Sequence, residues 1–166
     1  SNTENTTWVY VILILCTFIY FLFQILYFTS KKLFSKIYWG LLALVTAVTF
    51  FNTLWYEGGS AFNSLSSGLS CLILLVTCVY YYRMQLENPK FSFIDKKASF
   101  WIVSGIFLYS AGCLMVYLSF RYLIEFEYKN NEKETEYLLN GIWNIQDVII
   151  LITNMLFSKG LLCKQD

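Results

Sequence analysis

A row of polar side chains runs through the last apolar segment of the chain, and it is the part of the sequence best suited to chemistry. Its members are Asn140, Asn144, Asp147, Asn154 and Ser158. They are 4, 3, 7 and 4 residues apart, with Leu151 in the vacant heptad position, so a helix places them on one face. A carboxyl near the centre of a membrane costs about 2.5–3.5 kcal/mol. This polar stripe must therefore meet another helix, a water-filled cavity or a partner chain.

Two interpretations of the polar stripe stay open. In the first it is a structural clamp, in which each hydrogen bond between helices contributes about 0.6–2 kcal/mol. In the second it is a proton, ion or ligand site, or a face on which a partner docks. The candidate polar neighbours of Asp147 within the chain lie in three other apolar segments: Gln24, Thr49, Asn52, Thr53, Tyr109 and Tyr117.

Small residues form a second pattern, which concerns helix packing. They are spaced four or seven residues apart, so each set falls on one side of a helix and lets two backbones approach closely. We expect these faces to pack within the chain, or else to form the seam of a homodimer. The residues are Ser64, Ser67, Gly68, Cys71, Gly105 and Gly112.

Five apolar runs must position these residues, and each has about the length that a bilayer core 30 Å thick requires. No Lys or Arg lies inside them, and they are continuously apolar rather than alternating, which favours helices over a β-barrel. We expect an all-α fold, a polytopic transmembrane bundle of five helices in one domain, residues 1–166. The predicted spans are about 8–28, 37–56, 61–82, 99–120 and 138–158.

The distribution of positive charge predicts the orientation of the bundle. With the N-terminus outside, 9 of the 12 Lys and Arg residues fall on the inner side and 3 on the outer side. Such an excess marks the cytoplasmic side, so we expect the N-terminus outside and the C-terminus inside. The acidic outer segment 121–137 is expected to prolong the fourth helix before a break at Asn130–Asn131. The inner cations fit a bacterial inner membrane, and also a plasma membrane.

Composition removes several classes of function. Of all residues 57% are hydrophobic and 14% are charged, against about 25% charged in soluble domains. The net charge of +1 gives no footprint for nucleic acid. The chain has no His, which excludes a Ser/His protease, a His-ligated dimetal enzyme and a His-dependent acyltransferase. An aspartyl protease needs two intramembrane Asp, and only Asp147 lies in a span. We expect no catalytic residues, no metal site and no cofactor.

The last three segments carry a resemblance. Asn88–Pro89 is followed by Phe100-Trp101-Ile102, then by Gly105, Tyr109 and Gly112, and finally by Trp143 and Asn144. Over about residues 80–163 this pattern resembles uncharacterised small bacterial multi-span membrane proteins that occur in the setting of sensor histidine kinases. Members of that group often have about seven spans, whereas this chain has five. The resemblance implies a regulatory or sensory membrane role and no catalytic residue.

These observations favour a non-enzymatic integral membrane subunit with a sensory, regulatory or assembly role. We expect it to lie in the lipid bilayer and to dock another membrane protein or a second copy through its polar and small-residue faces. The alternative is an oligomeric channel or transporter for ions, protons or small solutes that uses Asp147. A weaker alternative is a binder of lipid or a small hydrophobic molecule, in a groove formed by the first and third spans.

Overall fold

A computed structural model of the chain describes residues 2–29, 32–56, 64–87, 96–130 and 132–163. These residues form five α-helices, and a π-helical turn, η1 (Asn52–Tyr56), continues the second of them. Each of the five has a stretch long and apolar enough to cross a membrane, and no described residue lies in a strand. The prediction of an all-helical chain with five such segments is confirmed. The helices are α1 (Asn2–Thr29), α2 (Lys32–Phe51), α3 (Ser64–Glu87), α4 (Ala98–Asn130) and α5 (Glu132–Leu162).

The last two helices are longer than the apolar runs that predicted them. α4 has 33 residues and α5 has 31. Since a helix rises 1.5 Å per residue, α4 is about 50 Å long and exceeds the 30 Å core of a bilayer. The predicted continuation of the fourth helix to a break at Asn130–Asn131 is confirmed in that α4 ends at Asn130. The first three residues of the predicted 61–82 span and the Asn88–Pro89 turn lie outside the described residues.

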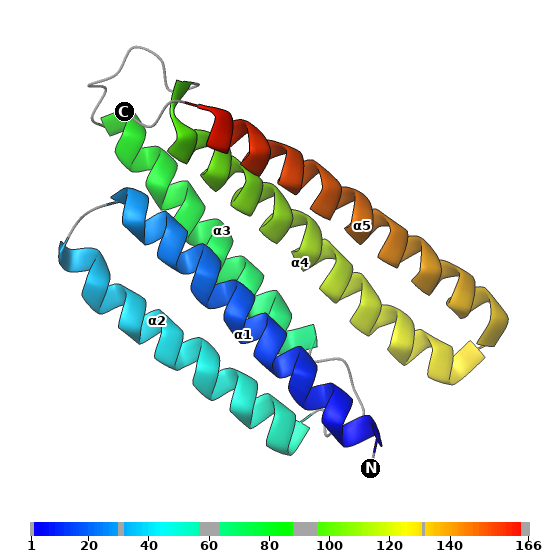
Figure 1. Cartoon of the computed structure of the whole chain (residues 1–166). Helices are drawn as coiled ribbons and strands as arrows, with labels where there is room; N and C mark the ends of the chain where they lie inside the picture. The colour runs from blue at the N-terminus through cyan, green and yellow to red at the C-terminus, as the bar shows by residue number, and fades with distance from the viewer. Residues whose placement is uncertain (1, 30–31, 57–63, 88–95, 131, 164–166) are drawn as a thin grey trace.

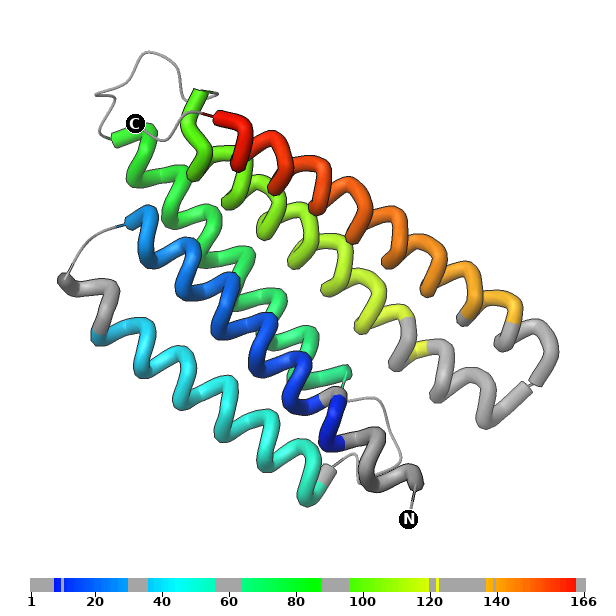
Figure 2. Tube along the Cα trace, in the orientation of Figure 1, coloured from blue at the N-terminus to red at the C-terminus, as the bar shows by residue number. Residues whose placement is uncertain are grey.

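The helices lie side by side as one elongated bundle, with α2 and α5 at its opposite edges (Figure 1). α1 packs against α2 and α3, and α3 packs in turn against α4. α5 packs along α4 and along no other described helix to a comparable extent, as the trace in Figure 2 also shows. One whole side of α5 is therefore left without a neighbour from the rest of the described chain.

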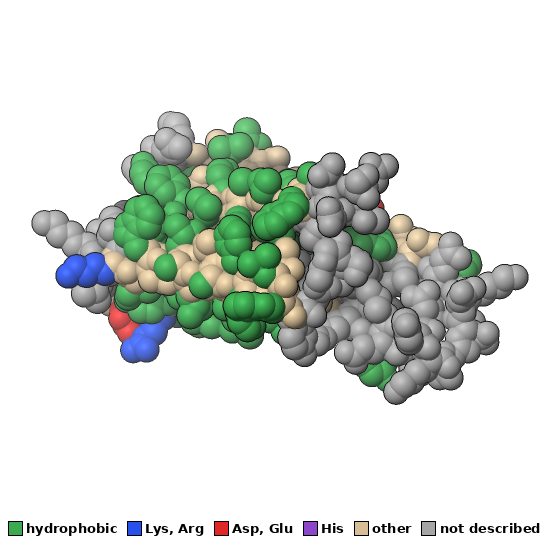
Figure 3. Space-filling model, turned by 90° about the horizontal axis from the view of Figure 1, so that it is seen from below, with side chains coloured by type: hydrophobic (Ala, Val, Ile, Leu, Met, Phe, Trp, Pro, Cys, Tyr) green, Lys and Arg blue, Asp and Glu red, His purple; other side chains and the backbone are tan. Residues whose placement is uncertain are grey.

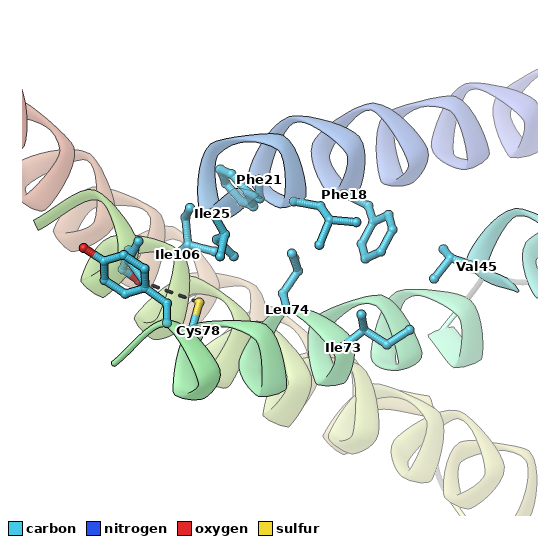
Figure 4. Close-up of a cluster of buried hydrophobic side chains, with 11 residues drawn as sticks. Phe18, Phe21, Ile25, Val45, Ile73, Leu74, Cys78 and Ile106 are labelled. Carbon is cyan, nitrogen blue, oxygen red and sulfur yellow. Dashed lines mark hydrogen bonds between the residues drawn. The ribbon is translucent and has the colours of Figure 1, made fainter. Parts of the chain in front are cut away.

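The hydrophobic core lies between α1, α3 and α4. Phe18, Leu22 and Ile25 of α1 are almost fully buried, and they meet Leu74 of α3 and Ile106 of α4 (Figure 4). α2 adds one side chain to this cluster, Val45, and α5 adds none that is fully buried. The core is therefore formed mainly by the central helices, and Phe157 of α5 packs against it from outside.

Outside this core the bundle is covered with apolar side chains. Figure 3 shows hydrophobic groups across the visible face, with Lys and Arg gathered at one end. Every Lys or Arg whose side chain the structure describes belongs to that end, because α2 starts there, α3 and α5 finish there, and α4 starts there. These residues are Lys36, Arg83, Lys96, Lys97 and Lys159.

Candidate functional site

The polar stripe lies on the open side of α5. The side chain of Asp147 is exposed, and so is that of Leu151, which occupies the vacant heptad position. The amides and the hydroxyl above and below them are exposed as well: Asn140, Asn144, Asn154 and Ser158. The sequence spacing therefore does place these residues on one face, and that face is turned away from the rest of the described chain.

The orientation of α5 is set by its opposite face, which packs on glycines of α4. A Cβ at Gly105 would lie 2.6 Å from the ring of Phe157, and one at Gly112 would collide with the side chain of Ile149. At 100° per residue, the face of α5 that carries Ile149 and Phe157 is about 140° away from the polar stripe. Close packing on the glycine side thus turns the polar stripe outward.

A third glycine, Gly160 of α5, completes this seam. A Cβ there would lie 3.2 Å from the backbone oxygen of Ala98, a distance at which the two helix backbones nearly touch. Sequence reasoning missed Gly160 because it follows Lys159 at the very end of the apolar run. The signal available was its heptad spacing from Thr153, which is buried on the same side of α5.

The polar residues expected to face Asp147 lie elsewhere in the bundle. Thr49, Asn52 and Thr53 are buried on α2 and η1, and the Asn52 amide donates to Ser66 Oγ of α3 at 3.4 Å. Because α2 is at the opposite edge from α5, none of these groups reaches the polar stripe (Figure 1). Their polar atoms instead join α2 to α3 or bond to their own helix.

The remaining candidate neighbours belong to the centre of the bundle. Gln24 is half-buried on α1. Tyr109 and Tyr117 of α4 line a cavity between α1, α3, α4 and α5, where the hydroxyl of Tyr109 interacts with Cys113 and Tyr117. The described residues therefore form no intrachain clamp on Asp147.

The small residues of α3 are turned inward. Ser64, Ser67 and Cys71 are buried. A Cβ placed on Gly68 would lie 3.8 Å from Cδ1 of Leu114 on α4. The small-residue faces of α3 and α4 thus both take part in packing within the chain. The α4 face meets α5. On α3, Ser64 and Gly68 lie beside Leu114 of α4, and Ser67 and Cys71 line a cavity beside Tyr109 of α4.

The polar stripe continues along an open surface toward the C-terminal end of α5, and every residue that lines this surface belongs to α5. Asp147, Asn154 and Ser158 line it together with Lys159. The Ser158 hydroxyl donates to the backbone oxygen of Asn154 at 2.8 Å, and the Lys159 ammonium lies 3.6 Å from the centre of the Trp101 ring. The hydroxyl and the ammonium at the C-terminal end thus have local partners, whereas Asp147 makes no hydrogen bond or ion pair with any described residue.

No metal-binding arrangement is present among the described residues. No group of three Cys, Asp or Glu side chains lies close enough to hold a metal ion. The five cysteines are unpaired, and Cys71, Cys78 and Cys113 are buried inside the bundle. What the arrangement can do is present carboxyl and amide groups to a second membrane helix.

Comparison with known proteins adds no relative. No protein-family model matches the chain, and neither a curated protein nor a solved structure is significantly similar to it.

Proposed function

We propose that this chain is a non-enzymatic integral membrane subunit with a sensory, regulatory or assembly role, which docks a partner through the polar stripe of α5. The observation that carries the proposal is the exposure of Asn144, Asp147 and Asn154 on a helix apolar enough to lie in a membrane. An isolated copy would turn these groups toward lipid, which cannot hydrogen-bond them. A partner helix that supplies donors and acceptors removes this penalty.

The same proposal includes an orientation and a location. The Lys and Arg side chains that the structure describes lie at the end of the bundle that holds the start of α2 and the end of α5. The positive-inside rule assigns this end to the cytoplasm, with the N-terminus outside and the C-terminus inside. A bacterial inner membrane, or a plasma membrane, is the setting that fits this charge distribution.

The test is extraction of the tagged protein from its native membrane in lipid nanodiscs, followed by native mass spectrometry. We expect wild type in a defined assembly with another membrane protein or a second copy. A variant that replaces Asn144, Asp147 and Asn154 by Leu should associate at least tenfold more weakly, because each amide or carboxyl contact contributes about 0.6–2 kcal/mol.

A matched control replaces apolar residues of the same helix and leaves its polar residues unchanged. Val148, Ile152 and Met155 are exposed apolar residues of α5, and their joint replacement by Leu should leave the assembly intact. If the polar-stripe variant assembles as wild type does, or if wild type has no partner, the proposal is wrong.

A second candidate function rests on the exposure of Asp147 on the open surface of α5. Several copies around one axis would turn their polar stripes toward a shared route for ions, protons or small solutes. In that case wild type is a homo-oligomer without other subunits, and Asp147→Ala changes ion or proton flux into liposomes. Flux equal to that of empty liposomes removes this candidate.

A further inference from the structure

A second site lies inside the bundle, in the half that holds the N-terminus and the start of α5. It is a cavity of about 310 Å³ between α1, α3, α4 and α5. Its apolar walls come from Phe18 of α1 and Leu74 of α3, and its rings from Tyr109 of α4 and Trp143 of α5. The volume falls at the lower end of the range for small-molecule sites.

A buried polar atom beside the cavity has no partner among the described residues. Gln146 of α5 lines the cavity, and its Oε1 is buried without a hydrogen bond to any described residue. Ser70 on the opposite wall is already bonded, since its hydroxyl donates to the backbone oxygen of Ser66 at 2.8 Å. A buried acceptor without a donor is costly, at about 1–3 kcal/mol, so the Gln146 side chain would gain by turning its Oε1 toward a ligand hydroxyl or amide in the cavity.

The cavity is reached from the side of the bundle. α1 and α5 do not pack directly along their length, and a ring contact joins them where Phe21 and Phe157 lie 6.0 Å apart. Toward the other end, Leu13 of α1 and Trp143 of α5 are 55% and 37% exposed and flank the cavity. A molecule dissolved in the bilayer can therefore enter between α1 and α5 without crossing an aqueous phase.

We propose that this cavity binds a small, uncharged aromatic compound from the membrane, whose hydroxyl donates to Gln146 Oε1. The cavity is lined by no Lys, Arg, Asp or Glu among the described residues, so an ionised ligand would find no counter-charge. Rings on three sides suit an aromatic guest by edge-to-face contact. The site does not involve the polar stripe and does not depend on the docking function.

The experiment uses a matched pair of photoreactive probes on the full chain in nanodiscs. The probes are 4-(3-trifluoromethyl-diazirin-3-yl)phenol and the same compound without its hydroxyl. Labelled peptides are mapped by mass spectrometry, with excess 2-naphthol as competitor. We expect the phenol to label α1 near Leu13 and α5 near Trp143 saturably, and the probe without a hydroxyl to bind about tenfold more weakly.

Labelling of two variants of α5 distinguishes a ligand site from an empty space between helices. Gln146→Leu removes the acceptor and should weaken labelling by the phenol about tenfold, while the thermal stability stays at or above that of wild type. Asn154→Leu removes an amide outside the cavity and should leave labelling unchanged.

Three outcomes would overturn the proposal. They are equal labelling by the two probes, labelling of Gln146→Leu at the wild-type level, and unsaturable labelling spread over lipid-facing residues. The polar-stripe variant serves to keep the two proposals apart. If it loses its partner but keeps saturable labelling, docking and ligand binding are separate properties of the chain.

Discussion

The interior of the bundle and the outer face of α5 both carry polar side chains, but of different kinds. Inside, the polar groups are mostly hydroxyls that bond to their own helix, four residues back. Thr49 donates to Val45, Thr53 to Thr49, and Ser70 to Ser66, at 2.7–2.8 Å. On the outer face of α5 the polar groups are chiefly amides and a carboxyl, and Ser158 alone is seen to bond back to its own helix.

This difference shows which polar residues require a neighbour in a membrane. A Ser or Thr hydroxyl can satisfy itself on the carbonyl of its own helix, and it then packs as a small apolar group. Asn and Asp carry more polar atoms than a helix backbone can serve. Polar residue type therefore distinguishes most interior hydroxyls, which bond within their own helix, from the exposed amides and carboxyl of α5. The buried hydroxyls of Ser110 and Thr153, which have no partner among the described residues, are exceptions.

The largest effect is expected at the seam that fixes which face of α5 points outward. Gly160→Leu forces a side chain against the backbone of Ala98 and should destabilise the protein by about 1–3 kcal/mol, with partial release of α5 from α4. Thermal unfolding in nanodiscs measures the loss. Gly141→Leu on the same helix is the control, because nothing lies within 4 Å of a Cβ at Gly141. Equal effects of the two substitutions would contradict the glycine seam.

A smaller effect is expected at the interior amide that does have a partner. Asn52 is 2% exposed and donates to Ser66, so Asn52→Leu should cost about 1 kcal/mol through the loss of a bond between helices. A double-mutant cycle with Ser66→Ala tests whether the loss belongs to this pair. Additive effects of the two substitutions would show that the amide stabilises the bundle by other contacts.

The smallest effect is expected for an interior hydroxyl. Thr49→Val removes a bond from Thr49 to the carbonyl of Val45, which belongs to the same helix. Because this carbonyl keeps its place in the backbone ladder, the change in stability should stay within about 0.5 kcal/mol. A loss larger than that of Asn52→Leu would reverse the comparison between hydroxyls and amides.

The sequence predicted the helices well and their neighbours poorly, for physical reasons. The apolar runs give the five helices because a membrane-spanning backbone must satisfy its own hydrogen bonds. The heptad spacing places Asp147 and Asn154 on one face for the same geometric reason. Which helix that face meets depends instead on close contacts such as Gly112 against Ile149, and such contacts are long-range in sequence. Thr49 and Asn52 were plausible neighbours by depth, yet they lie across the bundle.

The sequence likewise gave no sign that Oε1 of Gln146 would lack a partner. Gln146 is adjacent to Asp147, and a single residue step turns it by 100° toward the interior. Only the packing of α1 beside α4 shows that a space remains there.

The attachment of α5 to α4 has a consequence for biosynthesis. The core of α1, α3 and α4 contains no fully buried side chain from α5, so it can form before α5 is made. α5 leaves the ribosome after the other four helices and pairs with α4, which immediately precedes it. The polar stripe is thus displayed only once all five of these helices have been made, and a chain cut off before α5 does not carry it. A partner recruited through α5 would then bind only copies in which these five helices are present.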